Sequence, residues 1–83
     1  MLSVGGSANL SGASLWYANL ADADLQQADL TDADLRYANL ADAVFDYANL
    51  SNVNLLYTDL IDADFYFADL TNADLRYTDL SNG

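Results

Sequence analysis

A large apolar residue stands at every fifth position of this 83-residue chain, without a gap from residue 10 to residue 80. The residue two positions before each centre is small, and it is Ala in all repeats except those with Val53, Thr58 and Thr78. The residue in between is Asp or Asn, except at Ser14 and Val44. The predicted core consists of the fifteen centres, which are Leu10, Leu15, Leu20, Leu25, Leu30, Leu35, Leu40, Phe45, Leu50, Leu55, Leu60, Phe65, Leu70, Leu75 and Leu80.

A period of five is unsuited to an α-helix. Residues five apart on a helix differ by about 140° around its axis, so the centres would leave no single face to bury. In a strand, the small and large residues share one face and the Asp or Asn between them points the other way. The two residues that follow are often Asp, Asn, Ser or Gly, which suit a turn. Repeated strand-and-corner units predict a solenoid whose coils pair through backbone hydrogen bonds.

The second corner residue indicates how many sides each coil has. From Tyr17 on, Asp or Asn at this position alternates with an aromatic residue, Gln27 being the one exception, so the sequence carries a second period of ten. Only an even number of sides stacks like residues on like, and two sides would enclose nothing. Four is therefore the smallest workable number, and residues twenty apart should lie above one another at about 4.8 Å. Fifteen units then make just under four coils, with a length of about 18 Å.

The run of Ala-Asp-Leu and Ala-Asn-Leu units at fixed spacing resembles the pentapeptide-repeat proteins, over nearly the whole chain. The resemblance implies an all-β fold, a right-handed quadrilateral parallel β-helix, and its handedness comes from the resemblance alone. We expect residues 8–83 to form this domain and residues 1–7 to be a short N-terminal extension or partial cap. Whether the chain is natural, an excerpt or an engineered version of a longer repeat protein stays open.

Composition limits the chemistry available to the chain. It contains no His, Cys, Lys or Glu, its thirteen acidic residues are all Asp, and its only bases are Arg36 and Arg76. We therefore expect no catalytic residues, no cofactor and no enzymatic activity. The stacked Asp22, Asp42 and Asp62 at one corner are explained by solvation, by a bound cation or by selection for a negative surface, but the Gly-rich Asp loops of calcium-binding β-rolls are missing. We expect no metal site.

The net charge of −11 bears on partners and location. Such a surface repels nucleic acids and anionic membranes, so we expect no direct binding to either. No signal peptide or membrane-spanning segment is visible, which favours the cytoplasm. Some pentapeptide-repeat proteins act on type II topoisomerases as DNA mimics, which makes an acidic DNA mimic the alternative function. Against it, 18 Å corresponds to only about five base pairs.

One side of the predicted coil is rich in residues that dominate protein interfaces. In the structural interpretation, its stacked Tyr residues strengthen coil pairing. In the functional interpretation, the side is a binding face, because Trp, Tyr and Arg are enriched at interaction hot spots. The candidate interaction face comprises Trp16, Tyr17, Arg36, Tyr37, Leu56, Tyr57, Arg76 and Tyr77.

The two ends of the solenoid give a second candidate surface. Residues 1–21 carry no charge, and the outer coils are expected to have unpaired strand edges. Met1, Leu2 and Val4 are candidates for end-to-end stacking, which would give a two-fold dimer or a filament. Alternatively, these residues fold over the first coil as a cap. The predicted function is a structural or protein–protein interaction module that self-associates through its terminal coils, with another protein as a possible partner.

Overall fold

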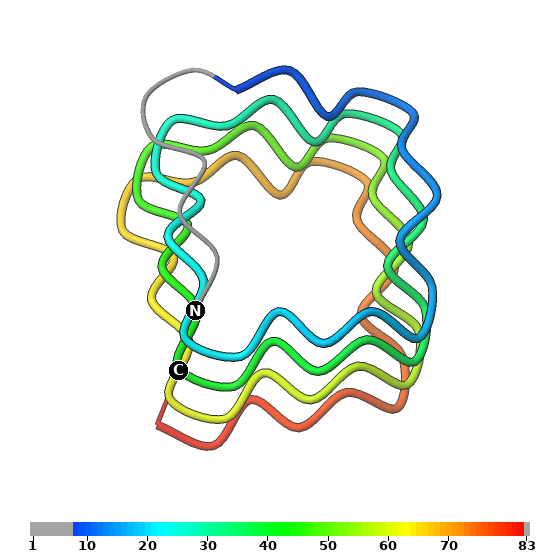
Figure 1. Ribbon diagram of the computed structural model, residues 1–83, viewed down its shortest axis with the longest axis vertical. Coiled ribbons are helices and arrows are strands. Elements are labelled where there is room, and N and C mark those ends of the chain that lie inside the picture. Colours follow the sequence, from blue (N-terminus) through cyan, green and yellow to red (C-terminus); the bar gives the residue numbers. More distant parts are fainter. Residues whose placement is uncertain (1–7, 83) are drawn as a thin grey trace.

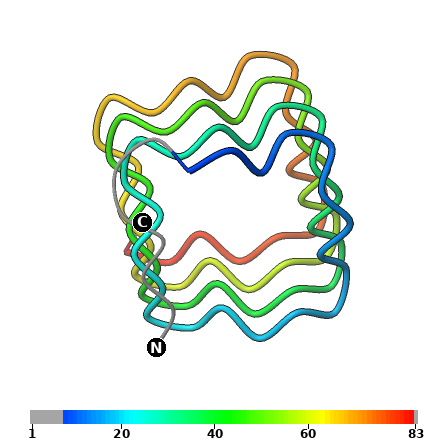
Figure 2. The same ribbon diagram turned by 45° about the horizontal axis from the view of Figure 1, so that its top comes forward.

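The computed structural model describes residues 8–82. The chain winds into four-sided coils that stack along one axis (Figures 1 and 2). Within this range there is no helix and no extended strand, and each ladder contact is an isolated parallel bridge. Every bridge joins residues twenty positions apart, from Asn9 with Asp29 to Asp59 with Asp79. One coil therefore takes four repeats, as the alternating corner residues predict.

Hydrogen bonds between coils use the backbone on both sides of each bridge. The N–H of Asp34 donates to the carbonyl of Ala13 in the coil before it, at 2.9 Å. The N–H of the next residue, Leu35, donates to the carbonyl of Asn54 in the coil after it, also at 2.9 Å. This alternation is the pattern of a parallel ladder, so each inner coil is bonded on both of its edges.

The corners that follow the centres from Leu10 to Leu70 are hydrogen-bonded β-turns. The carbonyl of Leu35 accepts the N–H of Ala38 at 3.1 Å, and the second corner residue, Tyr37, has a φ of 60°. One positive φ at the third position is the feature of a type II turn. Non-glycine residues at this position have φ between 55° and 62°, and five of them are Tyr. The left-handed region costs a bulky residue about 1 kcal/mol, so turn chemistry alone does not predict Tyr there.

The Asp or Asn of each repeat has a bonding role that the sequence pattern did not reveal. Its side-chain oxygen accepts the N–H of the residue two positions on, at 3.0 to 3.2 Å, in all thirteen repeats that have Asp or Asn there. This Asx-turn satisfies the one backbone N–H of the repeat that neither the ladder nor the β-turn uses. Within residues 8–82, Ser14 and Val44 are the two exceptions to this pattern.

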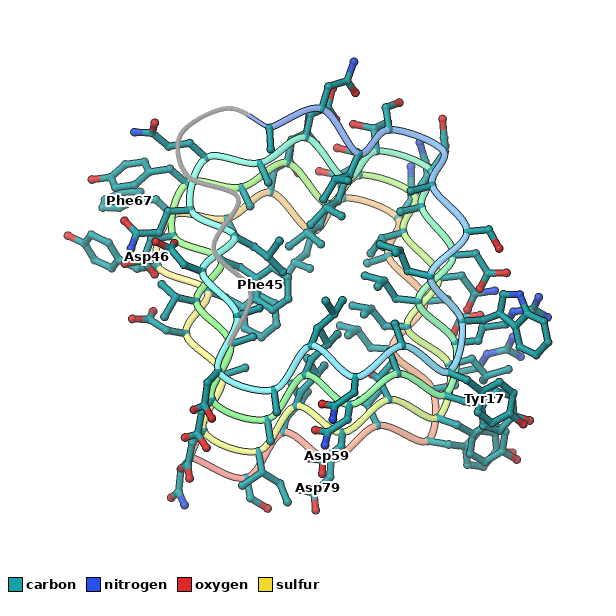
Figure 3. The ribbon with its side chains drawn as sticks, viewed as in Figure 1. Tyr17, Phe45, Asp46, Asp59, Phe67 and Asp79 are labelled. Atoms are coloured by element: carbon teal, nitrogen blue, oxygen red, sulfur yellow. The ribbon has the colours of Figure 1, made fainter. Side chains whose placement is uncertain are left out.

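The repeat centres point into the coil, as Figure 3 shows for Phe45. The centres from Leu20 to Leu60 are buried together with the small residues between them, and Phe45 stacks on Phe65 with ring centroids 4.8 Å apart. Centres in the outer coils are less covered, and Leu80, although predicted as core, is 43 % exposed. The reason is geometric, because no further coil within residues 8–82 covers it.

Two sequence predictions fall partly or wholly outside the described residues. Met1, Leu2 and Val4, the candidates for end stacking, lie there, and so does the proposed N-terminal extension 1–7. In the described part of the chain, no helix is long and apolar enough to cross a membrane.

Candidate interaction face

The four predicted Tyr residues of the candidate face form one continuous ladder at a corner of the coil. Tyr17, Tyr37, Tyr57 and Tyr77 stack in order, with ring centroids 4.8, 5.1 and 4.8 Å apart and planes within 9° of parallel. The twenty-residue register causes this directly, because each ring stands one coil above the next. Stacked aromatic pairs add about 0.5 to 1.5 kcal/mol beyond their buried area, so the ladder supports the fold.

Stacking also decides what the ladder presents to solvent. The ring faces of Tyr37 and Tyr57 are covered by their neighbours, yet the two side chains are 44 % and 48 % exposed. Their exposed parts are therefore ring edges and hydroxyl groups. Such a surface offers hydrogen bonds and apolar edges to a partner, and it leaves no free ring face between the inner rungs for a flat ligand.

Trp16 departs from this regular stack and creates a hollow beside it. Its ring lies edge to face with Tyr17, at a centroid distance of 5.1 Å and an angle of 68°, and Trp16 is 56 % exposed. The resulting open hollow has a volume of about 290 Å³ and is lined by Trp16, Tyr17, Arg36 and Tyr37. Sequence reasoning placed these four residues on one face, but it did not predict a concave site among them.

Both Arg side chains on this face are held by the Asp two positions earlier. The Arg36 Nε and Nη2 atoms donate to the two carboxylate oxygens of Asp34 at 2.8 and 2.7 Å. The same pair between Arg76 and Asp74 measures 2.9 and 2.8 Å. The guanidinium hydrogen bonds hold the pKa of Asp34 and of Asp74 below its usual value. The arrangement orients each guanidinium and cancels its charge.

The face is consequently neutral in a strongly acidic protein. Two of the thirteen Asp are matched by the two Arg here, and the other eleven account for the net charge of −11. Leu56 lies in the same column as the Arg residues and is half-buried. Elsewhere in residues 8–82, no group of three or more acidic residues has the geometry to hold a metal ion.

The repeats also match a known family. The family model for pentapeptide repeats matches eight copies, over residues 8–46 and 48–82. The chain belongs to the pentapeptide repeat family. Proteins of this family form right-handed quadrilateral β-helices and are not enzymes as a family. The sequence-based assignment of the family is thereby confirmed.

Solved structures of other pentapeptide repeat proteins have the same fold. The protein alr5209 from Nostoc Pcc 7120 is 32 % identical with a TM-score of 0.82, over 86 % of this chain and 58 % of its own. Rfr23 from the cyanobacterium Cyanothece 51142 is 30 % identical with a TM-score of 0.72, over 89 % of this chain and 57 % of its own.

A third similar structure is that of a protein with a regulatory role. HetL from Nostoc sp. strain PCC 7120, a protein involved in heterocyst differentiation regulation, is 33 % identical with a TM-score of 0.53, over 94 % of this chain and 38 % of its own. The 83-residue chain thus spans less than two thirds of the length of each of these three relatives. No curated protein matches the sequence.

Proposed function

We propose that this pentapeptide repeat protein is a non-enzymatic interaction module that binds another protein through the face around Trp16. The observation that carries the proposal is the hollow lined by Trp16, Tyr17, Arg36 and Tyr37, which lies on a neutral, aromatic side of a chain with a net charge of −11. Trp, Tyr and Arg are enriched among the few residues that supply most of the binding energy at protein interfaces, and these residues cluster in well-packed pockets.

Charge and rigidity both favour this face over the rest of the surface. Asp34 and Asp74 on this face are each paired with an Arg. A partner that approaches here therefore loses little free energy to charge repulsion. The stacked ladder and the bidentate Arg36–Asp34 pair hold the side chains in place before binding. Little side-chain entropy is then lost on association, which strengthens binding for a given contact area.

Quantitative affinity capture tests the proposal with a variant that the fold tolerates. Trp16→Thr is suitable, because Thr31 and Thr71 already occupy first-corner positions in other repeats. Ile61→Thr, at another corner of the coil and outside both aromatic clusters, is the matched control. We expect proteins enriched by the unaltered chain and by Ile61→Thr to be lost with Trp16→Thr.

Fluorescence then tests any captured protein directly. Trp16 is the only Trp in the chain and is 56 % exposed, so its burial by a partner should shift its emission to shorter wavelength. Equal capture by all three proteins, or binding that leaves Trp16 emission unchanged, would place the function elsewhere.

Self-association through an outer coil is the second candidate. In the described part of the chain, the N–H groups of Phe65, Leu70 and Leu75 have no backbone acceptor, and Leu80 is 43 % exposed. An edge with free donors and apolar centres favours pairing with a second copy. Light scattering over a wide concentration range, with Leu80→Asp as the variant, tests it. A mass that stays monomeric for the unaltered 83-residue chain would exclude this candidate.

A further inference from the structure

A second aromatic cluster lies on the side opposite the Trp16 hollow. Tyr47, Tyr66 and Phe67 are 57 %, 59 % and 68 % exposed. Phe67 stacks on Tyr47 at 5.4 Å, and the Tyr66 ring stands nearly perpendicular to both, at 5.9 Å from Tyr47 and 4.4 Å from Phe67. Figure 3 places Phe67 and Tyr17 at opposite corners of the coil. Three contiguous, mostly exposed aromatic rings mark an interaction surface.

The carboxylates beside this aromatic patch carry uncompensated charge. Val44 forms bridges to Asp24 on one side and Asp64 on the other, and Asp46 follows two positions later. The Oδ1 atom of Asp46 is buried and has no hydrogen-bond partner among the described residues. Burial and the neighbouring Asp64 carboxyl raise the pKa of Asp46. Both Arg residues of the chain are on the opposite face, so no guanidinium of its own reaches this one.

The protein contains an internal example of how such a carboxylate is matched. In the repeat of Asp34, an Arg two positions later binds both carboxylate oxygens. In the equivalent repeat of Asp64, the position is occupied by Tyr66, and Asp64 accepts only the backbone N–H of Tyr66, at 3.0 Å, among the described residues. The Asp64 carboxylate therefore has the position in its repeat that binds Arg36 in the repeat of Asp34, with an aromatic residue next to it in place of an Arg.

We propose that the patch of Tyr47, Tyr66 and Phe67 docks an Arg-bearing segment of another protein. Its guanidinium binds the Asp64 carboxylate as Arg36 binds Asp34, and it packs against the exposed aromatic rings. Arg fits this role better than Lys, because its planar fork makes two parallel hydrogen bonds to a carboxylate and stacks on rings. The net charge of −11 attracts such a segment from a distance. This surface is separate from the Trp16 face and, unlike that neutral face, selects a cationic partner.

Titration with defined peptides tests the docking surface on the whole chain. The probe is a short peptide of alternating Arg and Gly, compared with a Lys–Gly peptide of the same length, and the readout is the shift of backbone amide signals. We expect the Arg peptide to perturb residues 47 and 64–67, to bind more tightly than the Lys peptide, and to leave Trp16 emission unchanged.

Two variants separate specific binding at Asp64 from general attraction to an acidic protein. Asp64→Asn keeps the turn, because Asn54 accepts the same backbone bond from Leu56 at 3.1 Å. Asp32→Asn is the control, since it removes an equal charge from an exposed corner away from the patch. We expect Asp64→Asn to weaken binding by about tenfold, as loss of a charge-assisted hydrogen-bonded pair does. Asp32→Asn should weaken it by about twofold or less.

Three results would overturn the proposal. Equal losses of affinity in the two Asp variants would show that binding depends on net charge alone. Equal affinity for the Arg and Lys peptides would show that binding does not need a guanidinium. Signal shifts spread over all four sides, or centred on the Trp16 face, would show that the aromatic patch is not the docking surface.

Discussion

Replacing Asp46 by Asn should stabilise the protein at neutral pH. Asp46 has a buried carboxylate oxygen without a partner, and it lies beside the Asp64 carboxyl. An amide at this position donates a hydrogen bond to Asp64 where two carboxylates now repel each other. The fold accepts an amide there, because Gln26 occupies the equivalent position one coil earlier.

The size of the effect follows from the unpaired atom. An unsatisfied buried acceptor costs about 1 to 3 kcal/mol, and the lower part of this range applies because the rest of Asp46 is partly exposed. For a domain of this size, 1 kcal/mol of unfolding free energy shifts the Tm by about 4 to 8 °C. We therefore expect Asp46→Asn to raise the Tm by about 5 to 15 °C at pH 7.

The effect should depend on pH with a definite sign. The pKa of Asp46 is raised in the folded state, above its usual value of 3.8. At pH values between 3.8 and the raised pKa, the folded protein binds more protons than the unfolded chain. The stability contributed by Asp46 therefore increases as the pH falls through this range. The advantage of Asp46→Asn should be complete at pH 7 and should shrink as the pH falls through the raised pKa.

Thermal melts followed by circular dichroism at pH 7 and at mildly acidic pH measure both quantities. Asp32→Asn is the charge-matched control, because Asp32 is an exposed corner residue. If the two variants have the same Tm at pH 7, or if the gain of Asp46→Asn persists unchanged at acidic pH, the unpaired carboxylate is not the cause.

Other predictions test the core, the ladder and the turns by urea unfolding. Leu40 is fully buried, so Leu40→Ala should cost about 2 to 5 kcal/mol of unfolding free energy, and a loss below about 1 kcal/mol would contradict its inward position. Tyr37→Asn removes two stacked contacts, worth about 1 to 3 kcal/mol, and relieves about 1 kcal/mol of left-handed strain, so it should cost about 1 kcal/mol net; a gain of about 1 kcal/mol would show that the ladder contributes no stability. Asn39→Ala deletes the acceptor of the Ala41 N–H and should cost about 1 kcal/mol; an unchanged midpoint would remove the Asx-turn from the stabilising interactions.

Much of the fold could be predicted because the repeat is strictly local in its signals. The small and large residues two apart predicted one inward face, and Phe45 and Leu40 are fully buried as that pattern requires. The Trp, Tyr and Arg residues of the candidate face were placed in adjacent columns by the same arithmetic. Their contacts could not be predicted, since the angle between Trp16 and Tyr17 depends on side-chain rotamers and not on spacing.

The exceptions to the repeat were less informative in the sequence than in the structure. Val44 appeared only as an irregular residue between Ala and Phe. The structure places Val44 between Asp24 and Asp64 of the neighbouring coils, and Asp46, two positions later, has a buried oxygen without a partner. The patch of Tyr47, Tyr66 and Phe67 likewise received no role from the sequence, because exposure and missing counter-charges are properties of the assembled coil.

The sequence by itself determined the period, the inward residues and the number of residues per coil. These follow from the alternation of side chains along a strand and from the need to stack like corners, which are properties of neighbouring residues. Only the tertiary structure decided that Tyr rings cover one another's faces, that Trp16 and Arg36 line a hollow, and that neither Arg of the chain pairs with Asp64. The physical reason is that these features arise between coils, where contacts depend on rotamers, exposure and charge across twenty-residue separations.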